Sequence, residues 1–489
     1  MPKFEIKQKR TGKVLISGSA KSLKDLIHGA VMTGQDGSVS KLVLSKLKVT
    51  KAEKVKFYGA DLAGADLSSI DLTAGVFGGS DLTGADLSGS VLTGGDLSRT
   101  NLSRSYLAKA NVEAVNFAEA NLKGAELKGA KMDGAVLTDA DLTGADLSST
   151  KLNKAEWTRA ILKEAKLASC EMSRIKMLNN NLTKADLSYS RLVGARMSEA
   201  ELAQANLEHA DLTGANLSKA NLVGANLADA NLEGADLSEA NLEKANLSSA
   251  KLNKTNLSNA NLNGCRLNGA KLVETNLSNA SLNGASLNEV DAMRANFTGA
   301  QLKQAKLRNL KANKANLSQI HADNASFTGM EFSEADLTNA NLKQADLTDI
   351  KADNAILTST DMSGANLSRA KLNKVTMTGA LLVSAVLQGT ALLSVDASGA
   401  DFRGADLTSA DLHGSKLDSA DFSGSKLVGA KLGGVTMNGT KLIKCDLTKA
   451  DLSWATIDGA DFSGVKVGQT NFRGAQVNNV KGIKFKKKA

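Results

Sequence analysis

Residues 205–250 begin Ala-Asn-Leu-Glu-His, Ala-Asp-Leu-Thr-Gly, Ala-Asn-Leu-Ser-Lys, and the order Ala, then Asp or Asn, then Leu returns every five residues. With Leu207 as the centre of one unit, this phase extends from Phe57 to Val477 through 85 consecutive pentapeptides. A period of five matches neither an α-helix nor a β-strand. It predicts a solenoid in which each pentapeptide forms one side of a coil and turns a corner.

The pattern Ala-[Asp/Asn]-Leu-x-x resembles that of the pentapeptide-repeat family over about 420 of the 489 residues. The resemblance implies an all-β solenoid, a right-handed four-sided β-helix of about 21 coils with about twenty residues in each. The family includes topoisomerase-binding DNA mimics, secreted bacterial effectors and phage proteins. The resemblance therefore predicts the fold and leaves the function to be argued from the surface.

The resemblance also implies which side chains form the core, and the residue types support it. The centre of each pentapeptide and the residue two places before it are expected to point inward, and the other three to face solvent. Of the 85 centres, 79 are Leu, Phe, Met, Ile or Val, one is Trp157 and five are Ala. The position before the centre is mostly Asp or Asn, which favour turns. Coils stacked about 4.8 Å apart would form a rod of about 100 Å whose stability is nearly additive along its length.

Five pentapeptides exchange the sizes of their two inward residues, so that core volume is conserved locally. They are Val290 with Ala292, Leu310 with Ala312, Ile320 with Ala322, Ile350 with Ala352 and Val395 with Ala397. The least regular stretch is 156–180, where Trp157 replaces Leu, and Ile175 and Asn180 replace small residues. Two interpretations stay open for it, a kinked coil and an inserted helix, because its residues include good helix formers.

The two ends of the chain differ from the array at 57–480. Residues 1–56 carry 13 bases and 4 acids and predict a small α+β module, with a hairpin turning at Gly12 and a helix from Ser22 to Gly34. The module caps the solenoid or also docks a partner. The tail at 481–489 has five Lys and no acid. It either lays a last strand with Ile483 and Phe485 inward, preventing end-to-end association, or anchors the chain to an anionic surface.

The residue types argue against chemistry. Cys170, Cys265 and Cys445 all occupy the small inward position, and the four His are scattered without metal-ligand spacing. Carboxylate pairs one coil apart arise from the period itself, and nothing in the repeat predicts a pocket that would shift their pKa values. We therefore expect no enzyme activity, no catalytic residue, no cofactor and no metal.

The charges indicate a mixed surface. The side that contains Lys131 has ten Lys or Arg before its centres, whereas the opposite side has eight acids and Lys441. Corner lysines on the acidic side dilute this contrast, and few outward aromatics offer stacking, mainly Tyr106, Tyr189 and Trp454. The array has 42 bases and 47 acids, far fewer net negative charges than a DNA mimic needs. Nucleic acid is therefore not an expected partner.

We interpret the sequence as a non-enzymatic rigid rod, a structural spacer or protein-interaction scaffold of a phage or bacterial assembly. The alternatives are a modulator of a DNA-associated enzyme such as a type II topoisomerase, acting by partial DNA mimicry, and a secreted bacterial effector. No apolar run approaches about eighteen residues and no signal-peptide core is present. The expected location is the cytoplasm, a virion, or outside the cell by a route without a cleaved signal.

Overall fold

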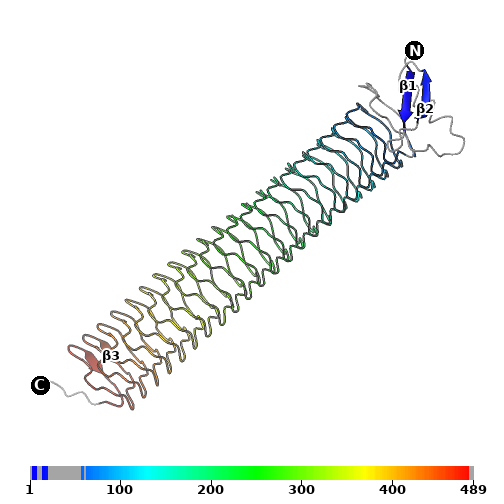
Figure 1. The fold of residues 1–489 in the computed structure, drawn as a ribbon. Coiled ribbons are helices and arrows are strands. Elements are labelled where there is room, and N and C mark those ends of the chain that lie inside the picture. The colour runs from blue at the N-terminus through cyan, green and yellow to red at the C-terminus, as the bar shows by residue number, and fades with distance from the viewer. Residues whose placement is uncertain (1–2, 8–13, 20–56, 60–61, 484–489) are drawn as a thin grey trace. The chain divides into compact units, whose positions relative to one another are not determined.

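The computed structural model consists of two units, Met1–Asn246 and Leu247–Ala489. The residues that it describes are 3–7, 14–19, 57–59 and 62–483. In each unit the described pentapeptides form a stack of coils with the same repeating pattern of one bridge residue followed by a turn (Figure 1). No α-helix occurs within these described ranges.

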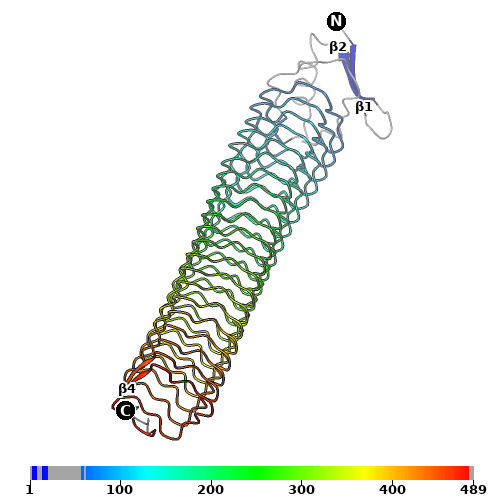
Figure 2. The ribbon, with the colours of Figure 1, turned by 90° about the vertical axis from the view of Figure 1, so that its left-hand side faces the viewer.

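Each coil contains twenty residues, because every bridge joins residues twenty positions apart in parallel register, as in Asp66 with Asp86 and Lys351 with Lys371. Four pentapeptides therefore make the four sides of a coil. At the C-terminal end two short strands continue this pairing (Figure 2). They are β3, Thr456–Asp458, and β4, Gln476–Asn478, which pair in parallel. This confirms a β-solenoid built from pentapeptides.

Backbone hydrogen bonds explain why five residues are the unit. The Leu207 N–H donates to the Asn226 carbonyl at 2.7 Å in the next coil, and the Asn206 N–H donates to the Ala185 carbonyl at 2.9 Å in the previous one. The Ala210 N–H closes a turn onto the Leu207 carbonyl at 3.0 Å, with His209 at φ 56°. A positive φ at the third residue is what a type II turn requires. Each pentapeptide thus bonds to both neighbouring coils and turns its own corner.

The core lies where the repeat predicts it. Centres from Phe57 to Phe462 are buried, and so are the residues two before a centre from Ala65 to Ala460. All five exchanged pairs are buried at both positions, which confirms their inward assignment.

Several Thr and Ser also occupy the small inward position. Many of their hydroxyls donate to the carbonyl of a centre residue in the preceding coil, as Thr275 does to Leu252 at 2.6 Å. Ser90, Ser105 and Ser190 donate instead to the centre three residues earlier, so these hydroxyls also have a partner.

The exchanged pairs give a packing prediction. Ala312→Leu should lower the free energy of unfolding by about 1–3 kcal/mol, because Leu310 already fills the same layer of the core. Adding Leu310→Ala should recover much of this loss, since the total volume returns to its original value. Urea denaturation of the single and double variants measures both changes. Equal instability of the two variants would show that the side chains do not share one space.

The stretch at 156–180 keeps the coil pattern, so the inserted helix is wrong. Glu156 bridges to Lys176, and Trp157 is fully buried. The irregularity comes from Asn180, whose side-chain amide donates to the carbonyls of Trp157 and Ala160. The Trp157 carbonyl also accepts its usual bond from the Ala160 N–H at 3.0 Å. In most described coils the acceptor equivalent to the Ala160 carbonyl is bonded by the backbone N–H twenty-one residues later. The Asn180 Oδ1 and Trp157 Nε1 atoms are buried without a hydrogen-bond partner.

The ends are described only in part. Strands β1, Lys3–Lys7, and β2, Val14–Ser19, pair antiparallel, which confirms the two strands of the hairpin. Its turn at Gly12 and the helix expected from Ser22 lie outside the described residues. At the other end Lys481 continues the ladder by bridging to Asp461. Phe485, on which the predicted last strand depends, also lies outside the described residues.

Candidate functional site

The outer surface is the candidate site, because the inward positions are filled. A shallow hollow of about 270 Å³ lies in the second unit, lined by Asn288, Glu289, Arg308 and Asn309. It is far from the apolar, convergent pocket that small-molecule sites use. In the described array, the side chains that can meet a partner are those of the three outward positions in each pentapeptide.

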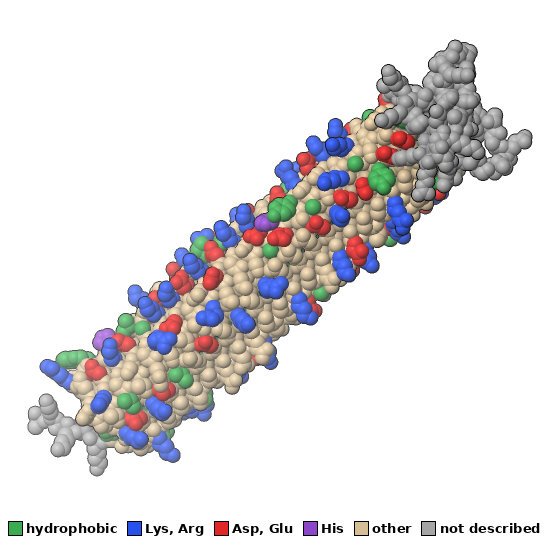
Figure 3. Space-filling model, viewed as in Figure 1, with side chains coloured by type: hydrophobic (Ala, Val, Ile, Leu, Met, Phe, Trp, Pro, Cys, Tyr) green, Lys and Arg blue, Asp and Glu red, His purple; other side chains and the backbone are tan. Residues whose placement is uncertain are grey.

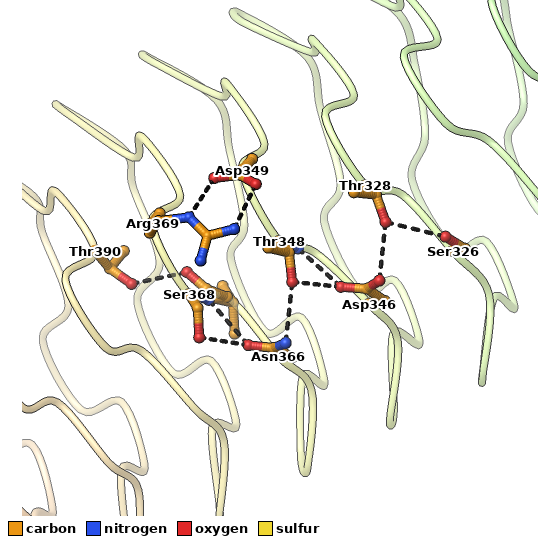
Figure 4. A network of polar contacts seen from close by, with 10 residues as sticks. Ser326, Thr328, Asp346, Thr348, Asp349, Asn366, Ser368, Arg369 and Thr390 are labelled. Atoms are coloured by element: carbon orange, nitrogen blue, oxygen red, sulfur yellow. Dashed lines mark hydrogen bonds and ion pairs between the residues drawn. The ribbon is translucent and has the colours of Figure 1, made fainter.

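Many of these side chains are bonded to the turn that follows them. The Asp346 carboxylate accepts hydrogen bonds from the Thr348 amide at 3.1 Å and from its hydroxyl at 2.5 Å. The Thr328 hydroxyl, one coil earlier, donates to the same carboxylate at 2.8 Å (Figure 4). The Asn366 amide extends the chain of contacts by donating to the Thr348 hydroxyl at 2.9 Å. The Asp and Asn of the repeat are thus turn-forming groups first.

These bonds lower the pKa of the carboxyl groups. For Asp346, partial burial would raise the pKa, but hydrogen bonds from Thr348 and Thr328 outweigh burial, so the pKa lies below its ordinary value. Asp401 is lowered chiefly by the hydrogen bond from Arg403, which reaches it at 2.6 Å. The other described Asp residues with a lowered pKa are Asp139, Asp141, Asp146, Asp349, Asp361, Asp406, Asp446 and Asp461.

These shifts predict acid sensitivity. A carboxyl whose pKa is lower in the folded than in the unfolded chain stabilises the fold at pH values above the unfolded pKa of about 4. That contribution is lost as the pH falls through the folded pKa. We expect the urea midpoint to be level from neutral pH to about pH 5 and to fall steadily below about pH 4. A midpoint unchanged at acid pH would contradict the structural role of these carboxylates.

Ion pairs run along the stacked coils. Most described pairs join residues twenty apart, such as Arg369 with Asp349 at 2.7 Å and Lys351 with Glu331 at 2.8 Å. Both partners are largely exposed, so each pair contributes little to stability. The pairs instead lower the surface potential, because the opposite charges of neighbouring side chains cancel. In Figure 3 basic and acidic side chains are interspersed over the visible face.

Ion pairing reduces the difference in charge between the predicted basic side and the predicted acidic side. Lys351 and Lys431 on the basic side pair with Glu331 and Asp411 of the same side. On the acidic side the corner residues Lys123, Lys303 and Lys343 pair with carboxylates at 3.0 Å, 3.4 Å and 3.1 Å. No continuous surface of one sign therefore runs along either side.

Three outward rings lie against the residue twenty positions later, which is a glycine for Trp454 and His413 and a histidine for Tyr189. A Cβ placed on Gly474 would be 2.5 Å from the Trp454 ring, and one on Gly433 would be 2.7 Å from His413. Tyr189 stacks on His209 with ring centroids 4.7 Å apart. These rings are packed against the next coil, which reduces their use as free stacking platforms.

The expected nonreactive side chains are placed as predicted. Cys170, Cys265 and Cys445 are buried free thiols, and burial raises their pKa to about 12, about 12 and about 11. The thiolate form that reacts or binds metal is therefore disfavoured. Within the described ranges no group of three His, Cys, Asp or Glu side chains is arranged to hold a metal ion. In the part of the chain that the structure describes, no helix has the length and apolarity to span a membrane.

Two family models match the chain. The model of pentapeptide repeats in eight copies matches nine segments between residues 53 and 464, and the model of a pentapeptide repeat region matches 240–317. Together the matches cover well over half of the sequence. A comparison with curated protein sequences gives no match.

Solved structures of similar proteins include three pentapeptide-repeat proteins. HetL, involved in heterocyst differentiation regulation in the cyanobacterium Nostoc sp. strain PCC 7120, is 29% identical over 42% of this chain and 86% of its own, with a TM-score of 0.20. Rfr23 from the cyanobacterium Cyanothece 51142 is 28% identical over 19% of this chain and 64% of its own, with a TM-score of 0.19. A protein of the Arabidopsis thaliana thylakoid lumen is 32% identical over 26% of this chain and 69% of its own, with a TM-score of 0.11.

Proposed function

Because the chain belongs to the pentapeptide-repeat family, we propose that it works without catalysis, as a structural spacer or protein-interaction scaffold. The proposal includes a right-handed array of about 21 coils over residues 57–480, an N-terminal cap or docking module at 1–56 and a lysine-rich tail at 481–489. Its setting would be a phage or bacterial assembly.

The interspersed charge of the outer surface carries this proposal. Basic and acidic side chains alternate along the coils and pair across them, as in Arg159 with Asp139 and Lys219 with Glu239. Such a surface is soluble and offers many hydrogen-bonding groups to another protein. Duplex DNA carries about one charge for every 1.7 Å of its axis, so imitating it needs a dense, one-signed surface. The paired charges argue against that alternative.

Affinity capture tests the scaffold proposal. The full chain, immobilised through one terminus, should retain a protein in stoichiometric amount from a lysate of its own host, and excess free chain should displace it. Nuclease treatment of the lysate should leave the capture unchanged, because the contact is between proteins. Retention that disappears with nuclease, or no displaceable protein at all, would contradict the proposal.

The tail has a separate test. If it caps the last coil, deleting residues 481–489 should cause chains to associate end to end, because unpaired strand edges become available. Light scattering of the full-length and truncated chains measures this. A truncated chain that stays monodisperse but loses salt-sensitive binding to anionic vesicles would instead support the anchoring alternative.

A further inference from the structure

Stretches of the second unit that contain bases but no acid include 247–273 and 292–322. The first of these two has four bases, and the second has the denser charge. The second stretch contains six bases, namely Arg294, Lys303, Lys306, Arg308, Lys311 and Lys314. The last five fall within one coil, on three of its consecutive sides, and all five side chains are exposed. We call Lys303, Lys306, Arg308, Lys311 and Lys314 the basic belt.

The centre of the belt differs from its ends in pairing. Lys303 pairs with Asp323 at 3.4 Å and Lys314 pairs with Glu334 at 3.5 Å. Among the ion pairs of the described residues, none involves Lys306, Arg308 or Lys311. Arg308 is near enough to Asp346 to help lower the pKa of that carboxyl group, but it forms no ion pair with it. Three adjacent outward cations without an ion pair are therefore available to an external partner.

The surroundings of Lys306 and Arg308 favour an anion. The bridge partners of Lys306 in the adjoining coils are Ser286 and Ser326, which are neutral hydrogen-bonding residues. The backbone of Arg308 is held by its N–H, which donates to Asn288 Oδ1 at 3.1 Å. Its side chain lines the hollow of about 270 Å³. The site thus combines a fixed backbone, two unpaired cations and room beside one of them.

Nearby carboxylates limit the height of the positive surface. Lys311 lies in its ladder between Asp291 and Glu331, and Glu289 lines the hollow opposite Arg308. Positive charge therefore extends around one coil, about 4.8 Å in height, and not along several coils. A nucleic-acid duplex needs many phosphate contacts spread over a longer surface, and these carboxylates would repel its backbone.

An extended peptide fits a belt of this shape. Lys306 is a bridge residue and Arg308 begins the turn two positions later, so their Cα atoms are at most about 6.6 Å apart. Carboxylates on alternate residues of an extended acidic peptide have about this separation. We propose that the basic belt binds an extended acidic segment of a protein partner, with Lys306 and Arg308 pairing to alternate carboxylates. This inference rests on the scaffold function and names the chemistry of its partner.

Fluorescence anisotropy tests the belt directly. The probe is a labelled peptide of about twelve residues that alternates Glu and Ser, compared with one that alternates Gln and Ser. The full chain should bind the acidic peptide alone, and binding should weaken as salt rises from about 0.05 M to about 0.3 M. The variant Lys306→Gln/Arg308→Gln/Lys311→Gln should bind at least about tenfold more weakly.

A matched control removes the same charge elsewhere in the unit. Lys251, Lys254 and Lys271 are also exposed, and no described ion pair involves them. They lie in the first of the two acid-free stretches, on one side of two successive coils, and no two of them are two residues apart as Lys306 and Arg308 are. Their triple replacement by Gln should change affinity by less than about twofold. Equal losses in both variants, binding of the neutral peptide, displacement of the acidic peptide by duplex DNA at lower concentration, or no binding by the full chain would each overturn the inference.

Comparison with the capture experiment separates the two proposals. If the full chain and the belt variant retain the same protein equally, the belt inference fails and the scaffold function stands. If neither captures a protein while the belt still selects the acidic peptide, the scaffold function fails and the binding chemistry of the belt stands.

Discussion

Replacing Phe422 with alanine is expected to lower the free energy of unfolding of the second unit by about 3–5 kcal/mol. Phe422 is buried, and its ring stacks on Phe402 of the preceding coil with centroids 4.6 Å apart and an interplanar angle of 1°. The substitution leaves a cavity under Phe402, and the hydrogen-bonded ladder on both sides prevents the coils from closing it. The loss also removes the contact between the two rings.

Hydrogen exchange of peptides covering residues 401–441, measured along a urea series, reports this loss locally. Phe472 supplies the control, because it is a centre near the end of the array and is only half buried. Phe472→Ala should therefore cost less than Phe422→Ala. Equal costs for the two variants would contradict the assignment of the core to the stacked centres.

Asn180→Asp should lower the free energy of unfolding of the first unit by about 3–5 kcal/mol, and Asn180→Thr should raise it by about 1–3 kcal/mol. Aspartate has the shape of asparagine but loses the amide that bonds the carbonyls of Trp157 and Ala160, and it buries a charge. Threonine keeps one donor and removes the buried Oδ1 atom that has no partner. Thr150 shows the expected geometry, with its hydroxyl donating to the Leu127 carbonyl at 3.2 Å.

Urea denaturation followed by the fluorescence of Trp157 measures both variants, because this ring is fully buried one coil from Asn180. The second tryptophan, Trp454, lies in the other unit and is 67% exposed, so Trp454→Phe removes the background signal at small cost. If Asn180→Thr were as destabilising as Asn180→Asp, the asparagine would be needed in its place and the buried Oδ1 atom would not be a source of instability.

The core could be predicted because the period of five assigns every residue to an inward or outward position. Even the exchanged pair of Leu310 and Ala312 follows from that assignment, since both are buried. For 156–180 the inserted helix, one of the two interpretations, was wrong. Its residues have good helix propensity, but the five-residue phase continues through them and the bridges between coils are kept. The role of Asn180 could not be predicted, since the carbonyls that its side-chain amide bonds are brought near it only by the stacking of the coils.

The surface was less predictable than the core. Sequence counts separated a basic from an acidic side, but side-chain reach decides the pairing, as when Lys343 reaches Asp361 at 3.1 Å. The aromatic contacts were visible in the sequence but not predicted, since Trp454 has Gly474 twenty residues later. The acid-free stretch at 292–322 was also visible in the sequence, but its unpaired centre became clear only once the neighbouring coils were placed.

A supercoiling assay with purified type II topoisomerase and the full-length chain tests the central claim most directly. If the protein is a scaffold whose paired surface charges bind other proteins, the enzyme's supercoiling rate should be unchanged at sub-micromolar concentrations of the chain. Inhibition of the enzyme, or its protection from a topoisomerase poison, at those concentrations would contradict the scaffold account and favour a modulator of DNA-associated enzymes.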